Sequence, residues 1–175
     1  MTDAGAASVH ASAVLVGDRA VLIRGPSGAG KSRLAFDLIV AGRAGQIPEA
    51  LLVGDDRVHL ETRGGQLVVR PARELAGLIE IRGLGILSCA FADEGPVGLV
   101  VDLAAADAER LPPPEALMTN IGGIEIPRIP AGVGYAPLPL VIAALTMTAI
   151  SSSSRPLADC PKGFGNHISP TLATE

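Results

Sequence analysis

The stretch Gly25-Pro26-Ser27-Gly28-Ala29-Gly30-Lys31-Ser32 matches the phosphate-binding loop pattern G-x-x-x-x-G-K-[ST] at every fixed position. The apolar run 20–23 before it predicts a buried strand, and residues 33–40 after it have the apolar spacing of a helix. A glycine-rich turn between a strand and a helix directs backbone N–H groups at an anion, which the helix dipole also favours. We therefore predict a nucleotide-binding loop in which Lys31 reaches the outer phosphates and the Ser32 hydroxyl holds Mg²⁺.

The composition fits a single aliphatic domain. Of the 175 residues, 48% are hydrophobic but only 2% are aromatic, so the core would consist of Leu, Ile, Val and Ala. The net charge of −4, without a long basic run, argues against nucleic acid or an anionic membrane as a partner. The first residues lack a secretory pattern, and the longest apolar stretch, 138–150, is shorter than the ~20 residues that span a bilayer. Cys89 and Cys160 form no metal or redox motif, and we expect a soluble cytoplasmic protein.

Apolar periodicity and turn residues outline the other elements. The further predicted strands are 10–16, 50–53, 58–61, 67–70, 97–103 and a short edge strand at 124–129. The helix after the loop is expected to end near Ala41-Gly42, where glycine suits a C-cap. A last helix is expected to have Pro139 in its first turn and to run through Ile150.

These elements predict an α/β fold of the P-loop kinase type, with a central β-sheet flanked by helices in a single domain. The domain is expected to cover residues 9–150. Residues 1–8 and the Ser- and Pro-rich residues 151–175 are expected to be flexible, since their composition shows no apolar periodicity.

Polar residues near two predicted strands could carry the chemistry. Asp55 and Asp56 follow a buried strand directly, where one carboxylate could meet the Mg²⁺ shell and the other accept a proton. A turn or a helix cap would explain the same pair. Glu80 and Arg82 would share one face of an extended segment and could meet metal and phosphate, or form a surface ion pair. His10, at the start of the first predicted strand, carries no local signal of a role.

Four segments, in the same order, make the chain resemble the HPr kinase/phosphorylase family of bacterial enzymes, which act on a serine of the phosphocarrier protein HPr. They are His10–Val14, the loop Gly25–Ser32, the Asp-Asp segment Leu52–Val58 and Ile79–Ile86, which is close to the family's signature. The resemblance covers about His10 to Ile150 and indicates the kinase domain, as in the short members that lack the family's N-terminal domain.

The resemblance implies a role for each matching residue. Lys31 would contact the transferred phosphate of ATP, while Ser32 and Glu80 would ligate Mg²⁺. Asp56, with Asp55 beside it, would be the base for phosphorylation and the acid for the reverse reaction. His10 would support Asp56.

The resemblance also implies roles for two arginines, one of which aligns with the family more closely than the other. Arg82 lies within the signature, whereas Arg110 matches a family arginine in a loosely aligned segment. The stretch 130–137 lacks the basic residues of the family's dephosphorylation loop, so we expect a kinase with low phosphorylase activity. The family also implies a homo-oligomer, often a hexamer.

The sequence therefore predicts an ATP- and Mg²⁺-dependent protein serine kinase that phosphorylates HPr. A small-molecule kinase of the same fold and a non-catalytic nucleotide sensor remain alternatives. A generic P-loop ATPase would instead use Asp102, at the end of the strand 97–103, as its second carboxylate.

Overall fold

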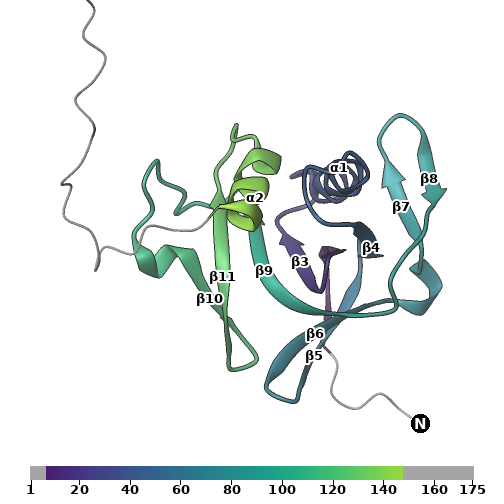
Figure 1. The fold of residues 1–175 in the computed structure, drawn as a ribbon, viewed down its shortest axis with the longest axis horizontal. Coiled ribbons are helices and arrows are strands. Elements are labelled where there is room, and N and C mark those ends of the chain that lie inside the picture. The colour runs from purple at the N-terminus through teal and green to yellow at the C-terminus, as the bar shows by residue number, and fades with distance from the viewer. Residues whose placement is uncertain (1–6, 148–175) are drawn as a thin grey trace, which may run out of the picture.

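The structure, a computed structural model, describes residues 7–147, which form one α/β domain (Figure 1). Within this range the strands of the main sheet are β1 (Ala7–Val9), β2 (Ser12–Val16), β3 (Arg19–Arg24), β4 (Ala50–Gly54), β5 (Val58–Arg63), β6 (Gln66–Pro71), β9 (Gly95–Leu103), β10 (Met118–Ile121) and β11 (Ile124–Ala131). The other elements are the hairpin strands β7 (Leu78–Ile81) and β8 (Gly85–Ser88), the helices α1 (Lys31–Arg43) and α2 (Pro137–Thr146), and two short 3₁₀ turns, Arg73–Leu75 and Pro114–Leu117. This is the α/β class that the sequence predicts.

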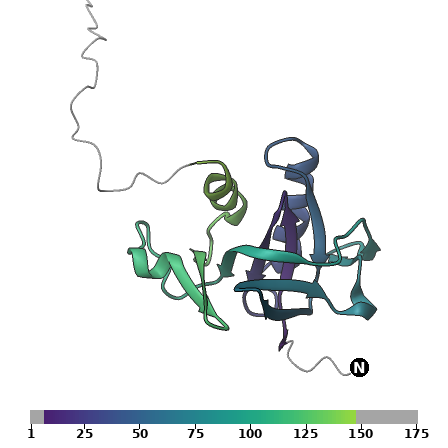
Figure 2. The ribbon, with the colours of Figure 1, turned by 60° about the horizontal axis from the view of Figure 1, so that its bottom comes forward.

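Strand β9 organises the sheet, whose order is β1-β5-β6-β9-β3-β2-β4 with β11 and β10 attached to β9. Its first residues, Gly95 and Pro96, pair antiparallel with β6, and the rest of the strand pairs in parallel with both β3 and β11. In the turned view of Figure 2, β9 connects the N-terminal strands with the green β10–β11 hairpin. Because β3, β9 and β11 are parallel, their carboxyl ends meet at one edge of the sheet, where open α/β sheets bind ligands.

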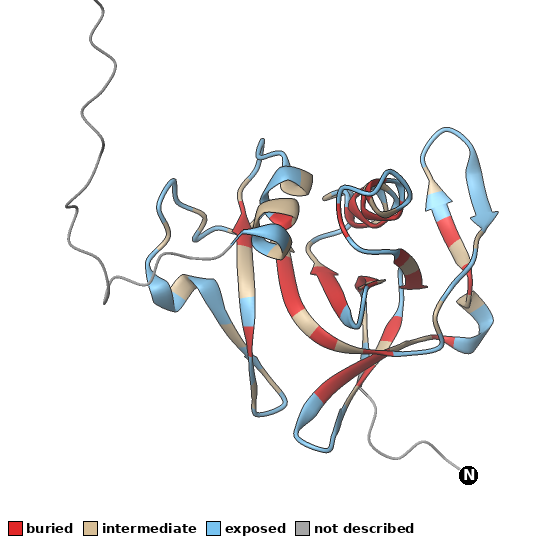
Figure 3. Cartoon of the chain, in the orientation of Figure 1, coloured by how far each residue is buried: buried red, intermediate tan, exposed pale blue. Residues whose placement is uncertain are grey.

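Two aliphatic clusters stabilise the domain. One lies between α1 and the sheet, where Leu34 and Leu38 pack on Ile23 and Val101. The other fills the opposite side and includes residues of β5 and β6, such as Val58 and Val69. Figure 3 shows the buried residues concentrated on the central strands and on one side of α1. Helices α1 and α2 lie near each other in Figure 1.

Helix α1 ends later than predicted, because the glycines near its end have other roles. Gly42 lies inside the helix, where an added Cβ would be 2.8 Å from both the Cβ and the N of Ala50. It therefore allows α1 to pack closely on β4. The left-handed residue that follows the helix is Gly45, with φ of 71°, and its N–H donates to the carbonyl of Gly42.

The predicted first strand, 10–16, is divided in two. His10 lies at a bend between β1, which pairs with β5, and β2, which pairs with β3 and β4. The strand predicted at 124–129 is confirmed, but its predicted position at the sheet edge is wrong. That segment is β11, which has β9 on one side and β10 on the other. Strand β10 went unpredicted because its residues are exposed or half-buried and give no apolar pattern.

The last helix starts at Pro137, so Pro139 lies in its first turn as expected, and it ends at Thr146. Met147, which was expected to be helical, is an extended residue after the helix. Residues 148–150 of the predicted helix lie outside the described residues, as do residues 1–6 and 151–175 of the segments expected to be flexible. Residues 7 and 8, which we assigned to the flexible N-terminus, belong to β1. Across the described range, 7–147, no helix is long and apolar enough to cross a membrane.

Cys89 is a free, half-buried thiol, and burial raises its pKa.

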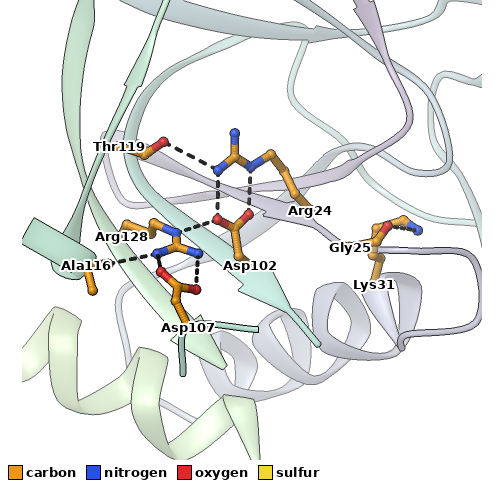
Figure 4. Close-up of polar contacts among 8 residues, drawn as sticks. All are labelled: Arg24, Gly25, Lys31, Asp102, Asp107, Ala116, Thr119 and Arg128. Atoms are coloured by element: carbon orange, nitrogen blue, oxygen red, sulfur yellow. Dashed lines mark hydrogen bonds and ion pairs between the residues drawn. The ribbon is translucent and has the colours of Figure 1, made fainter. Parts of the chain in front are cut away.

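An ion-pair network locks the carboxyl ends of the three parallel strands together (Figure 4). Arg24 on β3 donates to both carboxylate oxygens of Asp102 on β9, at 2.7 and 2.8 Å. Arg128 on β11 donates from Nε to the same carboxylate and from its terminal nitrogens to Asp107. Burial by itself would raise the pKa of Asp102, but the hydrogen bonds and charges of Arg24 and Arg128 outweigh it and lower that pKa.

We expect Asp102→Asn to lower the free energy of unfolding by roughly 1.5–3 kcal/mol near neutral pH, the range for hydrogen bonds to charged groups. Because the pKa of Asp102 is lower in the folded chain than the ~3.9 of an unfolded aspartate, its stabilisation is complete above that value. It is lost as pH falls through the folded value. Urea unfolding from pH 7 to pH 3 should show the difference between wild type and variant shrinking below pH ~4.

Asp93→Asn is the matched control, since Asp93 is an exposed aspartate in a bend. It should leave the unfolding free energy unchanged within ~0.5 kcal/mol. If the unfolding free energy of Asp102→Asn stays lower than that of wild type by the same amount down to pH 3, an electrostatic role for Asp102 is contradicted.

Candidate active site

A cavity of about 560 Å³ opens beside the phosphate-binding loop. It brings together residues from four separate segments of the chain. The predicted site residues that line it are His10, Ser27, Gly28, Gly30, Lys31, Ser32, Asp56, Glu80 and Arg82. The fold thus gathers most of the candidates at the edge where β3 ends and α1 begins.

The loop has the backbone geometry that phosphate binding requires. Gly30 precedes α1 in a left-handed conformation, with φ of 97°, that disfavours other residues. Its carbonyl accepts the N–H of Leu34 at 2.9 Å, which starts the helix. The first N–H groups of α1 have no partner within the helix, so they are available to an anion.

Lys31 lies across the loop and is 6% exposed. Its Nζ donates to the carbonyl oxygen of Gly25 at 3.0 Å (Figure 4). It also donates to the carbonyl oxygen of Pro26, at 3.1 Å. These contacts keep the ammonium group at the wall of the cavity that it lines. A positive charge in that position attracts phosphate oxygens.

Asp56 projects into the cavity from an unusual backbone turn. Its φ is 65°, and the N–H of Arg57 donates to the carbonyl of Asp55 at 2.8 Å, which makes a tight turn around Asp56. A left-handed aspartate costs some conformational energy and is tolerated where the surroundings fix it. The exposed carboxylate meets His10, whose Nε2 lies 3.0 Å from Asp56 Oδ1.

Asp55 lies behind the cavity and is 4% exposed. Its Oδ1 accepts the hydroxyl hydrogen of the fully buried Ser12 at 2.5 Å, and its Oδ2 accepts the backbone N–H of Glu80 at 3.1 Å. A buried carboxylate needs such donors, because desolvation of an unpaired charge is costly. Asp55 therefore links β2, β4 and β7 at the place where Asp56 and Glu80 enter the cavity.

The hairpin β7–β8 presents Glu80 and Arg82. Ile79 is buried against the α1 cluster and Ile81 is partly buried there, so Glu80 between them is exposed on the other face. Glu80 and Arg82 both line the cavity, as the expected alternation implies. Ser32 lines the same cavity as Glu80, so a hydroxyl and a carboxylate there could serve a hard cation.

Two of the candidate residues lie elsewhere. Arg110 is an exposed residue of the segment after β9 and does not line the cavity. Asp102, the carboxylate of the generic ATPase alternative, is bound by Arg24 and Arg128 and does not line the cavity either.

Sequence reasoning missed several residues that the fold brings to the site. Ser12 is recognisable only as a polar residue that starts an otherwise apolar strand. Phe36 and the ion-paired Arg33 and Asp37 line the cavity from the first two turns of α1. In the sequence these residues show only the apolar spacing of a helix.

Comparisons with known proteins agree on one family. Residues 3–148 match the model of the HPr Serine kinase C-terminal domain. An HPr kinase/phosphorylase from Mycoplasma mycoides is 31% identical over 163 residues, which are 85% of this chain and 50% of that protein. Its counterpart from Enterococcus faecalis is 38% identical over 141 residues, 73% of this chain and 43% of that protein. The chain thus spans half or less of these relatives.

A solved structure extends the agreement to three dimensions. The Hpr(Ser) kinase/phosphatase from Coxiella burnetii superimposes with a TM-score of 0.63 at 29% identity, covering 79% of this chain and 93% of that one. The family match spans all four segments that carry the candidate residues. The chain belongs to the HPr serine kinase C-terminal domain family.

Proposed function

We propose that this chain is an ATP- and Mg²⁺-dependent protein serine kinase domain that phosphorylates HPr, with low activity in the reverse, phosphorolytic direction. The observation that carries the proposal is the pairing of Asp56 with His10 in the same cavity as Lys31 and Ser32. A nucleotide sensor would need the phosphate loop but not a carboxylate poised as a base. The relatives named HPr kinase/phosphorylase support the choice of HPr as the substrate.

The residues fit a magnesium–nucleotide complex. In the described range, no three His, Cys, Asp or Glu side chains form a self-sufficient metal cage. Ser32 and Glu80 would instead hold Mg²⁺ together with phosphate oxygens, which is how this ion is commonly bound in kinases. When bound, Mg²⁺ supplies charge neutralisation on the phosphates. Lys31 and the N–H groups at the start of α1 would bind and orient the phosphate chain.

The transfer itself needs one proton acceptor. As the serine oxygen of HPr bonds to the γ-phosphorus, the bond from that phosphorus to the β,γ-bridging oxygen breaks and ADP leaves. The serine proton passes to the carboxylate of Asp56, which His10 orients. In reverse, the same carboxyl group would protonate the departing serine oxygen while phosphate attacks phosphoserine, forming pyrophosphate.

Incubation with ATP, Mg²⁺ and HPr, followed by mass spectrometry for phosphoserine, tests the proposal directly. Phosphoserine on HPr is the expected result. If the chain binds ATP but HPr is not phosphorylated, HPr is not its substrate. That result would favour a small-molecule kinase or a nucleotide sensor. The homo-oligomer implied by the family stays a prediction, for which light scattering of the same sample is the measurement.

We expect Asp56→Asn to slow the chemical step by roughly 10²–10⁴-fold, the usual contribution of a general base. Nucleotide affinity should persist, because the phosphate loop is unchanged. Single-turnover phosphorylation of HPr and calorimetric titration with ATP measure the two quantities. Asp18→Asn, at an exposed turn between β2 and β3, is the control and should behave as wild type. An unchanged rate in Asp56→Asn would remove Asp56 from the chemistry.

Asp55→Asn should act mainly through stability and alignment. An amide can accept from Ser12 but would turn its NH₂ toward the backbone N–H of Glu80, leaving a buried donor unpaired at a cost of about 1–3 kcal/mol. Urea unfolding should therefore show a clear loss for Asp55→Asn and little for Asp56→Asn. The opposite pattern would mean that Asp55 is the base and Asp56 the structural residue.

The reverse reaction should be much slower than the forward one, because the residues 130–137 that precede and begin α2 carry no positive charge. Phosphate carries about −1.5 to −2 charges at neutral pH and would bind weakly without a cation. Arg128, the nearest alternative in sequence, is engaged by Asp102, Asp107 and the carbonyl of Ala116. Release of pyrophosphate from phosphoserine-HPr and phosphate measures the rate. A rate equal to that of the forward reaction would contradict the inference.

A further inference from the structure

We infer that the nucleoside part of the phosphoryl donor binds in a second cavity, between the phosphate loop and the turn after β11, where Tyr135 stacks on the base. The inference rests on the proposed function, since it concerns the other end of the same nucleotide. It adds a binding subsite and a residue that the four matching sequence segments do not include.

The second cavity adjoins the first at the phosphate loop, where both are lined by Gly28. Its volume is about 250 Å³, and its lining includes Gly28, Ala29, Gly132, Tyr135 and Pro137. Gly28 lines both cavities, and an added Cβ at Gly28 would meet no protein atom within 4 Å. A ligand can therefore pass from one cavity to the other over Gly28.

The residues that line the two cavities indicate which end of the nucleotide binds in each. Asp56 and Glu80 line the first cavity, so the phosphate that is transferred must lie there. The described residues around the second cavity are uncharged, which suits the neutral part of the ligand rather than a phosphate. Its volume lies below the ~300–1,000 Å³ of pockets that enclose a whole drug-sized ligand, so it suits one portion of a larger molecule.

Tyr135 is held where it can serve as a stacking surface. Its N–H donates to the carbonyl of Gly132 at 3.1 Å, which closes a turn at the end of β11. A Cβ on Gly132 would lie 3.4 Å from the tyrosine ring, so the ring rests on bare backbone on that side. The side chain remains 43% exposed and lines the cavity. Aromatic side chains stack on any base, because every base has a π-face.

The experiment compares donors with and without a base. Wild type, Tyr135→Ala and Tyr135→Phe are titrated calorimetrically with ATP and with inorganic tripolyphosphate, both in Mg²⁺. We expect Tyr135→Ala to weaken ATP binding about tenfold while leaving tripolyphosphate affinity unchanged. Tyr135→Phe keeps the ring and should bind ATP as wild type does. Circular dichroism and thermal unfolding of each variant establish that the turn and α2 remain folded.

The other outcomes separate this inference from the proposed function. Unchanged ATP affinity in Tyr135→Ala would overturn the stacking site, and so would equal weakening of both ligands, which indicates a disturbed phosphate loop. If wild type binds ATP with the predicted dependence on Tyr135 but leaves HPr unphosphorylated, the subsite stands and the proposed function fails. If HPr is phosphorylated and Tyr135→Ala binds ATP normally, only the subsite is overturned.

Discussion

The buried carboxylate of Asp55 is the contact on which the geometry of the site depends. It joins Ser12 on β2 to the backbone of Glu80 on β7, and it lies at the carboxyl end of β4. Each of these segments has an exposed neighbour that enters the cavity: His10 precedes β2, Asp56 follows β4, and Glu80 itself projects from β7. One desolvated charge with two donors therefore fixes the relative positions of three functional side chains. The donors keep that charge from being unpaired in the interior.

This arrangement gives two adjacent aspartates different surroundings, and the proposed function assigns structure to Asp55 and chemistry to Asp56. Asp55 is nearly covered and fully hydrogen-bonded, while Asp56 turns to the opposite side through its left-handed backbone. A regular strand would also send adjacent side chains to opposite faces, but it would carry Asp56 onward along the sheet. The tight turn instead ends β4 and holds the second carboxylate at the cavity rim beside His10. The local conformational cost is thus part of how the site is built.

Much of this could be predicted from the sequence, because the relevant signals are local. The phosphate loop, the strand before it, and the hairpin β5–β6 follow from glycine positions and apolar runs. The partition between Asp55 and Asp56 could not be predicted, since it depends on Ser12, which lies 43 residues earlier in the chain. Gly42 looked like a helix end because sequence alone does not reveal its close approach to Ala50. The engagement of Arg128 could not be predicted either, because Asp102 and Asp107 lie 26 and 21 residues earlier in the chain.

The central place of β9 has a consequence for how the chain folds. Strands β2, β3 and β4 are close in sequence and can pair locally. The other edge of β3 pairs with β9, and Arg24 and Asp102 in that pair are 78 residues apart in the chain. During synthesis, which proceeds from the N-terminus, the edge of β3 remains unpaired over that interval. An apolar open edge is a template for wrong strand pairing. Pairing across such a sequence separation is also slow, because loop closure precedes any stabilising contact. The strand that leads into the phosphate loop is therefore synthesised early but fully paired late. Nascent chains should be most prone to aggregation before β9 has emerged from the ribosome.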